Sequence, residues 1–187
     1  MNKYSFKDIL EKNIEVQDEH NNEISIQLDK IEIPKIQRDY AQGRESQGEV
    51  RKRFLNSIFE ALETKTEIDM DFIYGSVKEV KVNNKKINMF IPLDGQQRLT
   101  TLYLLHWYIG TKELEEQQRI KLNSLLKKFT YETRTSSRRF CEKLTETTLF
   151  FLKKPSEEIK NLHWFYKSYK QDPTIKAMLN MLDAINE

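Results

Sequence analysis

The sequence predicts an α+β protein, in which a small α/β domain over residues 1–110 is followed by an all-helical region over residues 111–187. In the first part, segments that alternate apolar and polar residues, as strands do, are interleaved with segments whose apolar residues recur at helical spacing. From Thr111 onward only helical patterns occur. A chain of 187 residues is long enough for one domain with a helical extension. We therefore expect a small mixed sheet in the first part and helices alone in the second.

Composition indicates a folded, soluble protein with a heavily charged surface. Hydrophobic residues make up 38% of the chain and charged residues 32%, while the aromatic share of 11% is too high for a disordered chain. The 31 basic and 29 acidic residues give a net charge of +2, which is no global signature of nucleic-acid binding, although a local basic face stays open. The single cysteine, Cys141, excludes an internal disulfide framework and a cysteine-based zinc site.

Neither a membrane segment nor a signal peptide is evident. No segment approaches the about 20 apolar residues that a membrane-spanning helix needs. The first residues, MNKYSFKDILEKN, are amphipathic rather than continuously apolar. We therefore expect a cytoplasmic location and no membrane partner.

The N-terminal elements are expected to be a short helix and two strands. Ser5 and Asp8 can cap the helix. Residues 23–28, EISIQL, alternate like a half-buried strand, and residues 30–34, KIEIP, form a second short extended piece. Residues 37–48 are polar and typical of a loop.

An amphipathic helix is expected next, over residues 47–63. Ser46 and Glu49 have the Ser-x-x-Glu spacing of a capping box. The apolar residues at helical spacing behind them are Val50, Phe54, Ile58 and Leu62.

Two strands joined by a turn follow this helix. Residues 70–82 predict a strand with Phe72 and Tyr74 on one face. The sequence NNKK at residues 83–86 predicts a turn, and residues 87–93 return as a strand.

The segment LTTLYLLHWYI, residues 99–109, is apolar on nearly all sides and predicts a buried helix, for which Gly110 is a natural C-cap. Four further helical patterns lie beyond it. They cover residues 113–129, 131–144 as a short loop followed by a helix with Ser136 or Ser137 as cap, 155–170, and 172–187 with Asp172 as N-cap and Pro173 at the first helical position.

The motif DGQQR, Asp94 to Arg98, lies between a strand and the buried helix. Polar groups this dense at the joint of two buried elements are costly unless each has a partner. The first turn of a helix has unpaired N–H groups and a partial positive charge, which together favour a phosphate. Gly95 lets the backbone approach a ligand closely, and Arg98 can hold phosphate oxygens with a bidentate fork.

The other side chains of the turn suit nucleotide chemistry. Gln96 and Gln97 can hydrogen-bond phosphates, a ribose or an attacking water. Asp94 can hold a magnesium ion, directly or through water, or accept a proton. Thr100 and Thr101 add hydroxyls within the first helical turn. The motif is not a Walker sequence.

A purely structural interpretation of the motif stays open. In it, Asp94 caps the helix and Arg98 pairs with a neighbouring carboxylate.

A second polar cluster, IPKIQRDY, also ends a short extended piece. It contributes Gln37, Arg38 and Asp39, and Tyr40 could stack on a base or a sugar. A surface loop is the alternative interpretation.

Taken together, IPKIQRDY, the strand-like DFIYGS and IPLDGQQRLTTLYLL resemble the N-terminal domain of GmrSD-type restriction proteins, in the ParB/sulfiredoxin-like superfamily. YETRTSSRRFC and DPTIKAMLNMLDAI resemble the helical region that follows, so the resemblance covers nearly the whole chain. It implies a ParB/sulfiredoxin-like α/β domain whose DGQQR turn binds a nucleoside triphosphate, with magnesium, and supports its hydrolysis. It also implies a role in bacterial defence, where such proteins commonly restrict modified phage DNA.

The resemblance assigns a nucleotide site to the matching positions. Asp94 to Arg98 would line it, with Gln37 and Arg38 beside them. Adding Tyr40 and Thr100 completes the expected set, in which Asp94, Gln96, Gln97 and Arg98 carry catalysis.

One departure limits this expectation. Full members of the family have a C-terminal nuclease domain with a His-Asn-His type site, and nothing like it occurs before Glu187. Cleavage is therefore not assigned to this chain, and DNA is expected as a partner of the full-length protein.

Two alternatives remain from the residues themselves. Arg134, Arg138 and Arg139 gather near a predicted helix start and could contact a DNA backbone, so a ParB-like DNA-binding module without a nucleotide role stays open. A scaffold that docks partner subunits is the other. Asp71 followed by Glu79 and Lys81 superficially matches the Asp…Glu-x-Lys pattern of metal-dependent nucleases, but a solvated ion pair of Glu79 and Lys81 on a strand face is the simpler interpretation.

Overall fold

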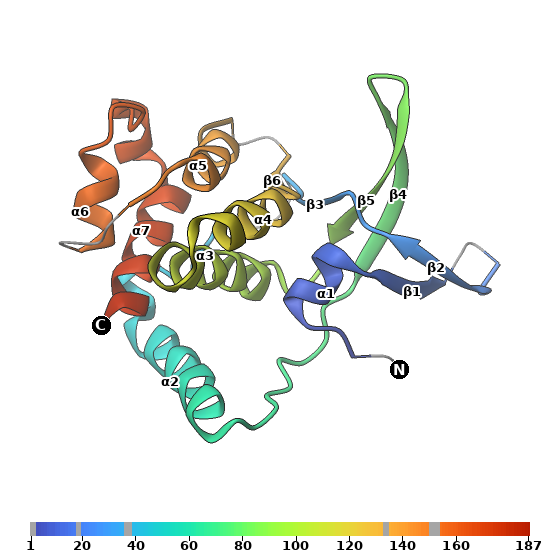
Figure 1. The fold of residues 1–187 in the computed structure, drawn as a ribbon, viewed down its shortest axis with the longest axis horizontal. Helices are drawn as coiled ribbons and strands as arrows, with labels where there is room; N and C mark the ends of the chain where they lie inside the picture. The colour runs from blue at the N-terminus through green and yellow to red at the C-terminus, as the bar shows by residue number, and fades with distance from the viewer. Residues whose placement is uncertain (1–2, 18–19, 36–38, 133–134, 150–153) are drawn as a thin grey trace.

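The computed structural model describes residues 3–17, 20–35, 39–132, 135–149 and 154–187. It confirms the predicted α+β class, with most of the helices gathered at one end of the molecule and most of the strands, together with α1, at the other (Figure 1). The α-helices are α1 Phe6–Glu11, α2 Gly48–Thr64, α3 Gln96–Glu113, α4 Glu116–Leu126, α5 Thr135–Glu146, α6 Pro155–Lys160 and α7 Pro173–Asn186, and the 3-10 helices are η1 Glu45–Gln47 and η2 Lys167–Gln171.

The strands form two small sheets. One is an antiparallel pair of β1, Asn13–Gln17, and β2, Glu23–Gln27. The other has the order β4-β5-β3-β6 and is mixed, since β5 is antiparallel to β4 and parallel to β3, which is parallel to β6. Its strands are β3 Lys30–Ile33, β4 Gly75–Val82, β5 Lys85–Pro92 and β6 Phe129–Tyr131.

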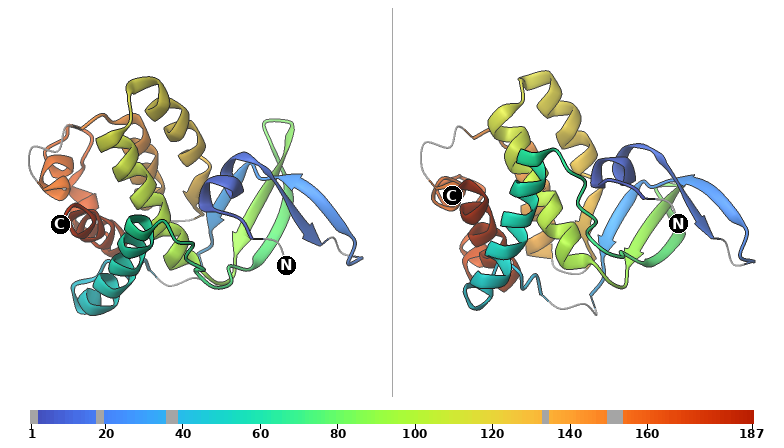
Figure 2. Two further views of the ribbon diagram at one scale, coloured as in Figure 1. Left: turned by 60° about the horizontal axis from the view of Figure 1, so that its bottom comes forward. Right: turned by 90° about the horizontal axis from the view of Figure 1, so that it is seen from below.

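Helix α3 is central to the core. Its residues Tyr103, Leu104 and Trp107 have no exposed surface, as expected for a helix that is apolar on nearly all sides. It packs against α4 and α7, and Figure 2 shows α2 alongside α7 on the far side of the molecule from the strands. One cluster of buried apolar side chains runs from Phe6 to Ile185, so both halves of the chain contribute to the same core.

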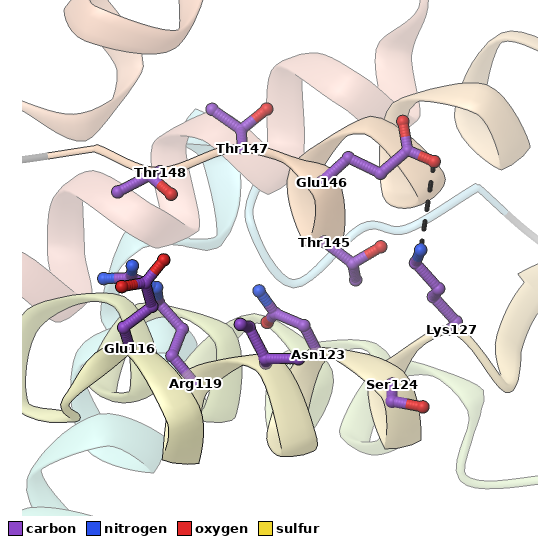
Figure 3. A pocket seen from close by; sticks show the side chains of 10 residues that line it. Glu116, Arg119, Asn123, Ser124, Lys127, Thr145, Glu146, Thr147 and Thr148 are labelled. Carbon is purple, nitrogen blue, oxygen red and sulfur yellow. Dashed lines mark ion pairs between the residues drawn. The ribbon is translucent and has the colours of Figure 1, made fainter.

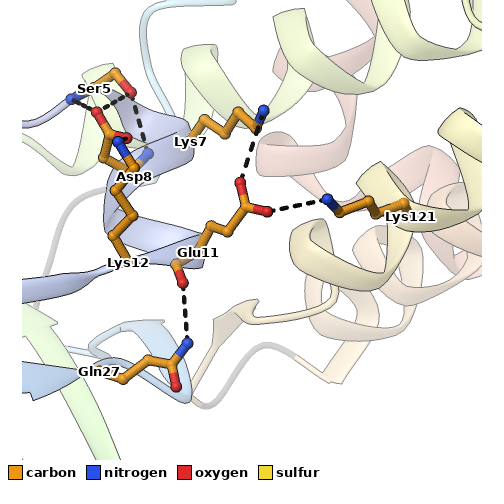
Figure 4. Close-up of polar contacts among 7 residues, drawn as sticks. All are labelled: Ser5, Lys7, Asp8, Glu11, Lys12, Gln27 and Lys121. Carbon is orange, nitrogen blue, oxygen red and sulfur yellow. Dashed lines mark hydrogen bonds and ion pairs between the residues drawn. The ribbon is translucent and has the colours of Figure 1, made fainter.

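Helix α1 joins the β1–β2 sheet to the helical part (Figure 4). Ser5 and Asp8 form the predicted capping box. Hydrogen bonds from Lys12 and Ser5 lower the pKa of Asp8 to about 2. Glu11 pairs with Lys121 of α4 at 3.2 Å, and its carbonyl accepts a hydrogen bond from Gln27 of β2 at 3.0 Å.

Three helix-cap predictions were wrong. Helix α2 begins after Gln47 without a side-chain cap, so Ser46 and Glu49 form no capping box. Gly110 lies inside α3 rather than after it, because its missing Cβ gives room to Leu122 of α4, whose Cδ2 would lie 2.4 Å from such an atom. Ser136 and Ser137 are within α5, where both hydroxyls donate to the Asp172 carboxylate.

The strand and helix bounds also differ in places. The segment expected to hold only helices contains β6, which is stabilised by pairing with β3. Residues 70–74 precede β4, and Phe72 and Tyr74 are 60% exposed rather than packed on a sheet. In α2 the buried residues are Leu55 and Ile58, whereas Val50 and Leu62 are exposed. Residues 155–170 form α6 and the start of η2 instead of one helix.

Candidate functional site

The DGQQR turn is positioned by the residue that precedes β4. Strand β5 ends at Pro92, and the next two backbone N–H groups, of Leu93 and Asp94, donate to the carbonyl of Tyr74 at 2.9 and 3.1 Å. Helix α3 then begins with Gly95 as its N-cap and has no side-chain capping bond. The chain therefore passes from strand to helix through a turn in which no side chain of the described residues caps the first helical N–H groups.

Gly95 is required by the fold itself. Its φ of 84° lies in the left-handed region that L side chains rarely adopt. A Cβ at this position would lie 2.7 Å from Cγ1 of Ile73. The close approach that Gly95 permits is therefore to Ile73 of the neighbouring segment.

Gln97 joins the two polar motifs. Its Oε1 accepts hydrogen bonds from the backbone N–H groups of Ala41 at 2.7 Å and Gln42 at 3.2 Å, and its Nε2 donates to the carbonyl of Asp39 at 3.1 Å. The end of IPKIQRDY thus lies against the first turn of α3, more than fifty residues away along the chain. Gln37 and Arg38, expected beside DGQQR, lie outside the described residues.

A buried hydroxyl network continues from this bridge. The Tyr40 hydroxyl lies 2.8 Å from Oγ1 of Thr101, which also donates to Oε1 of Gln42 at 2.8 Å. Tyr40 is 1% exposed, and burial raises the pKa of its phenol. Its ring is therefore packed in the core, and its expected contact with a base or a sugar stays a prediction.

Arg98 holds the segment that precedes β4. Its guanidinium donates to the backbone carbonyls of Met70 and Phe72, the latter at 2.6 Å, and lies 3.5 Å from the Asp94 carboxylate. Asp71, between the two carbonyls, has a φ of 65°. Because a guanidinium has five N–H donors, these contacts leave donors for a ligand on a side chain that is 20% exposed.

Asp94 fits only part of the structural interpretation. It pairs with Arg98, as that interpretation expects, but it does not cap α3. Its side chain is 59% exposed, so the carboxylate is accessible to a ligand or an ion.

Gln96 and Thr100 face inward. Gln96 is 8% exposed and its Nε2 donates to the carbonyl of Pro92 at 3.0 Å. Thr100 is 1% exposed, and its hydroxyl lies 2.9 Å from the Gln96 carbonyl and 3.0 Å from the Tyr131 hydroxyl. Both side chains stabilise the joint between β5 and α3, and their expected contact with a nucleotide stays a prediction.

Exposed apolar side chains border the turn. Phe72 and Tyr74 are each 60% exposed and Leu93 is 50% exposed. The sequence did not predict these exposed side chains, because Phe72 and Tyr74 have the alternating spacing of a strand and were expected on one face of it. Nor does any sequence signal mark the carbonyls that hold Arg98, since every residue has one.

Among the described residues, no group of three or more His, Cys, Asp or Glu side chains is placed to hold a metal ion. A magnesium ion bound with a nucleotide usually takes only one or two protein carboxylates, because the phosphates and water supply the other ligands. Exposed Asp94 fits that role.

The arginine cluster near α5 is only partly available to DNA. The Arg138 guanidinium donates to the carbonyl of Tyr131 at 2.8 Å and to that of Glu132. Arg139 is exposed, and Arg134 lies outside the described residues. The structure therefore gives Arg138 a role in fixing the end of β6 at Tyr131 and Glu132.

A polar groove of about 420 Å³ lies between α4 and the C-terminal end of α5 (Figure 3). Its charged lining residues are two acids, Glu116 and Glu146, and two bases, Arg119 and Lys127, and Glu146 lies 4.0 Å from Lys127. None of its lining residues belongs to DGQQR. With balanced charge and no contribution from either motif, it is not the phosphate site that the sequence predicts.

The fold and the DGQQR joint define an α+β domain in which two separate polar motifs meet at the start of one buried helix. The family model for the GmrSD restriction endonuclease N-terminal domain matches residues 7–187, and the chain belongs to this family. Membership confirms the resemblance and supports a role in restriction. No curated protein and no solved structure matches the chain. None of the described helices is long and apolar enough to cross a membrane.

Proposed function

We propose that this domain binds a nucleoside triphosphate with magnesium at the DGQQR turn, and that binding or hydrolysis gates the effector part of a restriction protein. The observation that carries the proposal is the bridge from Gln97 to the Asp39–Gln42 segment. It gathers two polar motifs at the start of an 18-residue helix that has no side-chain cap.

The phosphates are assigned to the first turn of α3 and to Arg98. Among the described residues, no side chain caps the backbone N–H groups after Gly95, and the helix dipole favours an anion there. Arg98 is already oriented by the carbonyls of Met70 and Phe72 and retains further N–H donors. A phosphate therefore meets a guanidinium that is held in place before binding.

Asp94 is assigned to the magnesium ion or to water. Its carboxylate is largely exposed and lies one residue before the helix N-cap. When bound, magnesium would neutralise phosphate charge. Arg98 stays close enough to Asp94 to orient its carboxylate.

For hydrolysis, the proposal assigns orientation of the attacking water to Gln97, with Gln96 holding the turn. The amide nitrogen of Gln97 donates one of its two hydrogens to the Asp39 carbonyl and keeps the other for a phosphate oxygen or the water. Gln96 is fixed to Pro92 and supports the backbone that carries Gln97.

Calorimetric titration of the folded chain with each of the four NTPs, with and without magnesium, tests binding. We expect heat with at least one nucleotide and tighter binding when magnesium is present. Release of inorganic phosphate from the nucleotide that binds tests hydrolysis separately. Absence of heat with every nucleotide would overturn the proposal.

A scaffold is the second candidate, because every polar side chain of DGQQR has a partner within the protein. In a scaffold, Arg98→Ala lowers the melting temperature and alters no nucleotide affinity. In a nucleotide site the same variant loses affinity, which a titration of the folded variant at low temperature measures directly.

A further inference from the structure

The β4–β5 hairpin projects from the body of the protein as a two-stranded ribbon. The neighbouring strand β3 pairs with β5 only at Met89 and Phe90, whereas β4 and β5 pair along their whole length to the Val82–Lys85 pair at the tip. Figure 1 shows the tip standing clear of the helices and of the other sheet. An isolated two-stranded ribbon is marginally stable in water, so its length needs a reason other than stability.

The ribbon is strongly basic. Its strands contain four lysines and one acid, Glu79, a net charge of +3 in a chain whose total is +2. Glu79 pairs with Lys86 at 2.7 Å. The three other lysines are exposed and make no ion pair with any described residue, and we call them the ribbon lysines: Lys78, Lys81 and Lys85.

The register places like charges against each other. Lys81 is directly opposite Lys86 across the ribbon, an arrangement that destabilises a sheet. Because side chains alternate along a strand, Lys81 and Lys86 occupy one face, while Lys78 and Lys85 occupy the other. The hairpin therefore presents positive charge on both faces and near its tip, and the described part of the fold offsets only one of the four lysines.

We propose that the β4–β5 hairpin is a contact surface for duplex DNA and that the ribbon lysines bind its phosphates. A two-stranded ribbon fits the major groove of B-DNA, which is about 12 Å wide. Lysines on both faces of such a ribbon meet the phosphate backbones on both sides of the groove. These contacts are independent of the nucleotide site and of base sequence or base modification.

Protection of an edge strand is the competing explanation. Lysines on exposed edge strands prevent pairing with another copy of the chain. That role predicts self-association when the lysines are removed, and it predicts no loss of DNA affinity.

A matched pair of variants separates the two explanations. The first replaces the ribbon lysines with Gln. The control replaces three exposed lysines of the helical end with Gln: Lys160, Lys170 and Lys176. Both variants have the same net charge, so any difference reflects the position of the charges and not their total. Circular dichroism melting verifies that each is folded.

Fluorescence anisotropy with a short labelled duplex, without nucleotide and over a range of salt concentrations, measures affinity. We expect the ribbon variant to bind about tenfold or more weakly at low salt, while the control binds like the parent. The slope of log affinity against log salt falls by about 0.9 for each lysine that contacts a phosphate, so by about 2 to 3 for the ribbon variant.

Two results would overturn the proposal. One is equal affinity and equal salt slope for the ribbon variant and the control. The other is a ribbon variant that keeps parental DNA affinity but dimerises or aggregates in analytical ultracentrifugation, which is the result of edge protection. Replacement of the ribbon lysines with Arg retains positive charge, and this variant should bind DNA as well as the parent does.

Discussion

Gln97 accepts a hydrogen bond from the backbone N–H of Ala41 at 2.7 Å, and this contact connects the two polar motifs of the chain. The acceptor lies in the second residue of α3, and the donor lies just beyond IPKIQRDY. The side-chain amide of Gln97 hydrogen-bonds with three backbone groups. It therefore determines where the end of IPKIQRDY lies relative to the N-terminus of α3. The proposed site depends on this relation.

Gln97→Ala should therefore destabilise the protein. The substitution removes the acceptor of two part-buried N–H groups and the donor to Asp39, and unsatisfied groups of this kind cost about 1 to 3 kcal/mol. Urea denaturation measures the loss. Gln118→Ala, at an exposed position of α4, is the control and should change little. Equal stability of the two variants would show that the bridge does not stabilise the fold.

Two glycines near this bridge make a matched pair. A Cβ at Gly43 would lie 1.8 Å from the backbone carbonyl oxygen of Ala177, which cannot move without shifting α7. At Gly48, in the first turn of α2, a Cβ would meet nothing within 4 Å. Gly43→Ala should cost about 3 kcal/mol or more, while Gly48→Ala should be neutral or slightly stabilising. Thermal unfolding compares them, and a tolerated Gly43→Ala would contradict the packing of this loop on α7.

Gly95→Ala combines left-handed backbone with a clash against Ile73. We expect a loss of about 1 to 3 kcal/mol. Ile73→Ala in the same chain removes the Cγ1 contact at 2.7 Å but leaves the Cβ of residue 73 at 3.1 Å and the backbone strain, so the double variant should recover only part of the loss caused at Gly95. Denaturation of both single variants and the double variant forms a mutant cycle. An additive cycle would mean that Ile73 does not restrict this position.

His106 should make stability depend on pH. Burial lowers the pKa of His106, and the positive charge of Lys7 lowers it further. The hydrogen bond to the Leu102 carbonyl raises this pKa, but burial is the larger effect. Above the ordinary histidine pKa of about 6.5, the His106 side chain is neutral in both the folded and the unfolded state. Its contribution to the free energy of unfolding therefore does not change with pH in that range. As the pH falls below this ordinary pKa, the unfolded state takes up the proton first, so stability is lost until the pH passes the lowered folded-state pKa.

Urea denaturation at about pH 7.5 and about pH 5.5 measures this effect. His106→Gln cannot titrate and should lose less stability over the interval than the parent does. His163→Gln, at an exposed position, should behave like the parent. A parental pH dependence in the His106 variant would assign the effect to other groups.

Local signals explain which elements could be predicted. The Ser5–Asp8 capping box and the Asp172–Pro173 start of α7 are correct, because each depends on residues within one helical turn. The predictions that were wrong concern features that depend on contacts between residues far apart in the sequence. Strand β6 is three residues long and depends on β3, about a hundred residues earlier in the chain. Gly110 makes room for the side chain of Leu122 and does not mark the end of the helix.

The candidate site shows the same division. The polar turn, its helix and the pairing of Arg98 with a neighbouring carboxylate follow from the sequence of a few residues, although that carboxylate is Asp94, which was expected to cap the helix. The Gln97 bridge and the carbonyls of Met70 and Phe72 do not, because backbone acceptors carry no sequence signature. Tyr40 was predicted as a ligand contact on residue type alone, whereas tertiary packing buries it.

Calorimetric titration of the parent, Arg98→Ala and Arg139→Ala with NTP and magnesium tests the central claim most directly. Arg98 lies at the DGQQR turn, and exposed Arg139 lies on α5, so the two variants remove the same charge from different places. We predict that Arg98→Ala weakens nucleotide binding by about tenfold or more, as expected for the loss of a charge-assisted contact, while Arg139→Ala binds like the parent. Equal affinities for a folded Arg98→Ala and the parent would contradict a phosphate site at DGQQR.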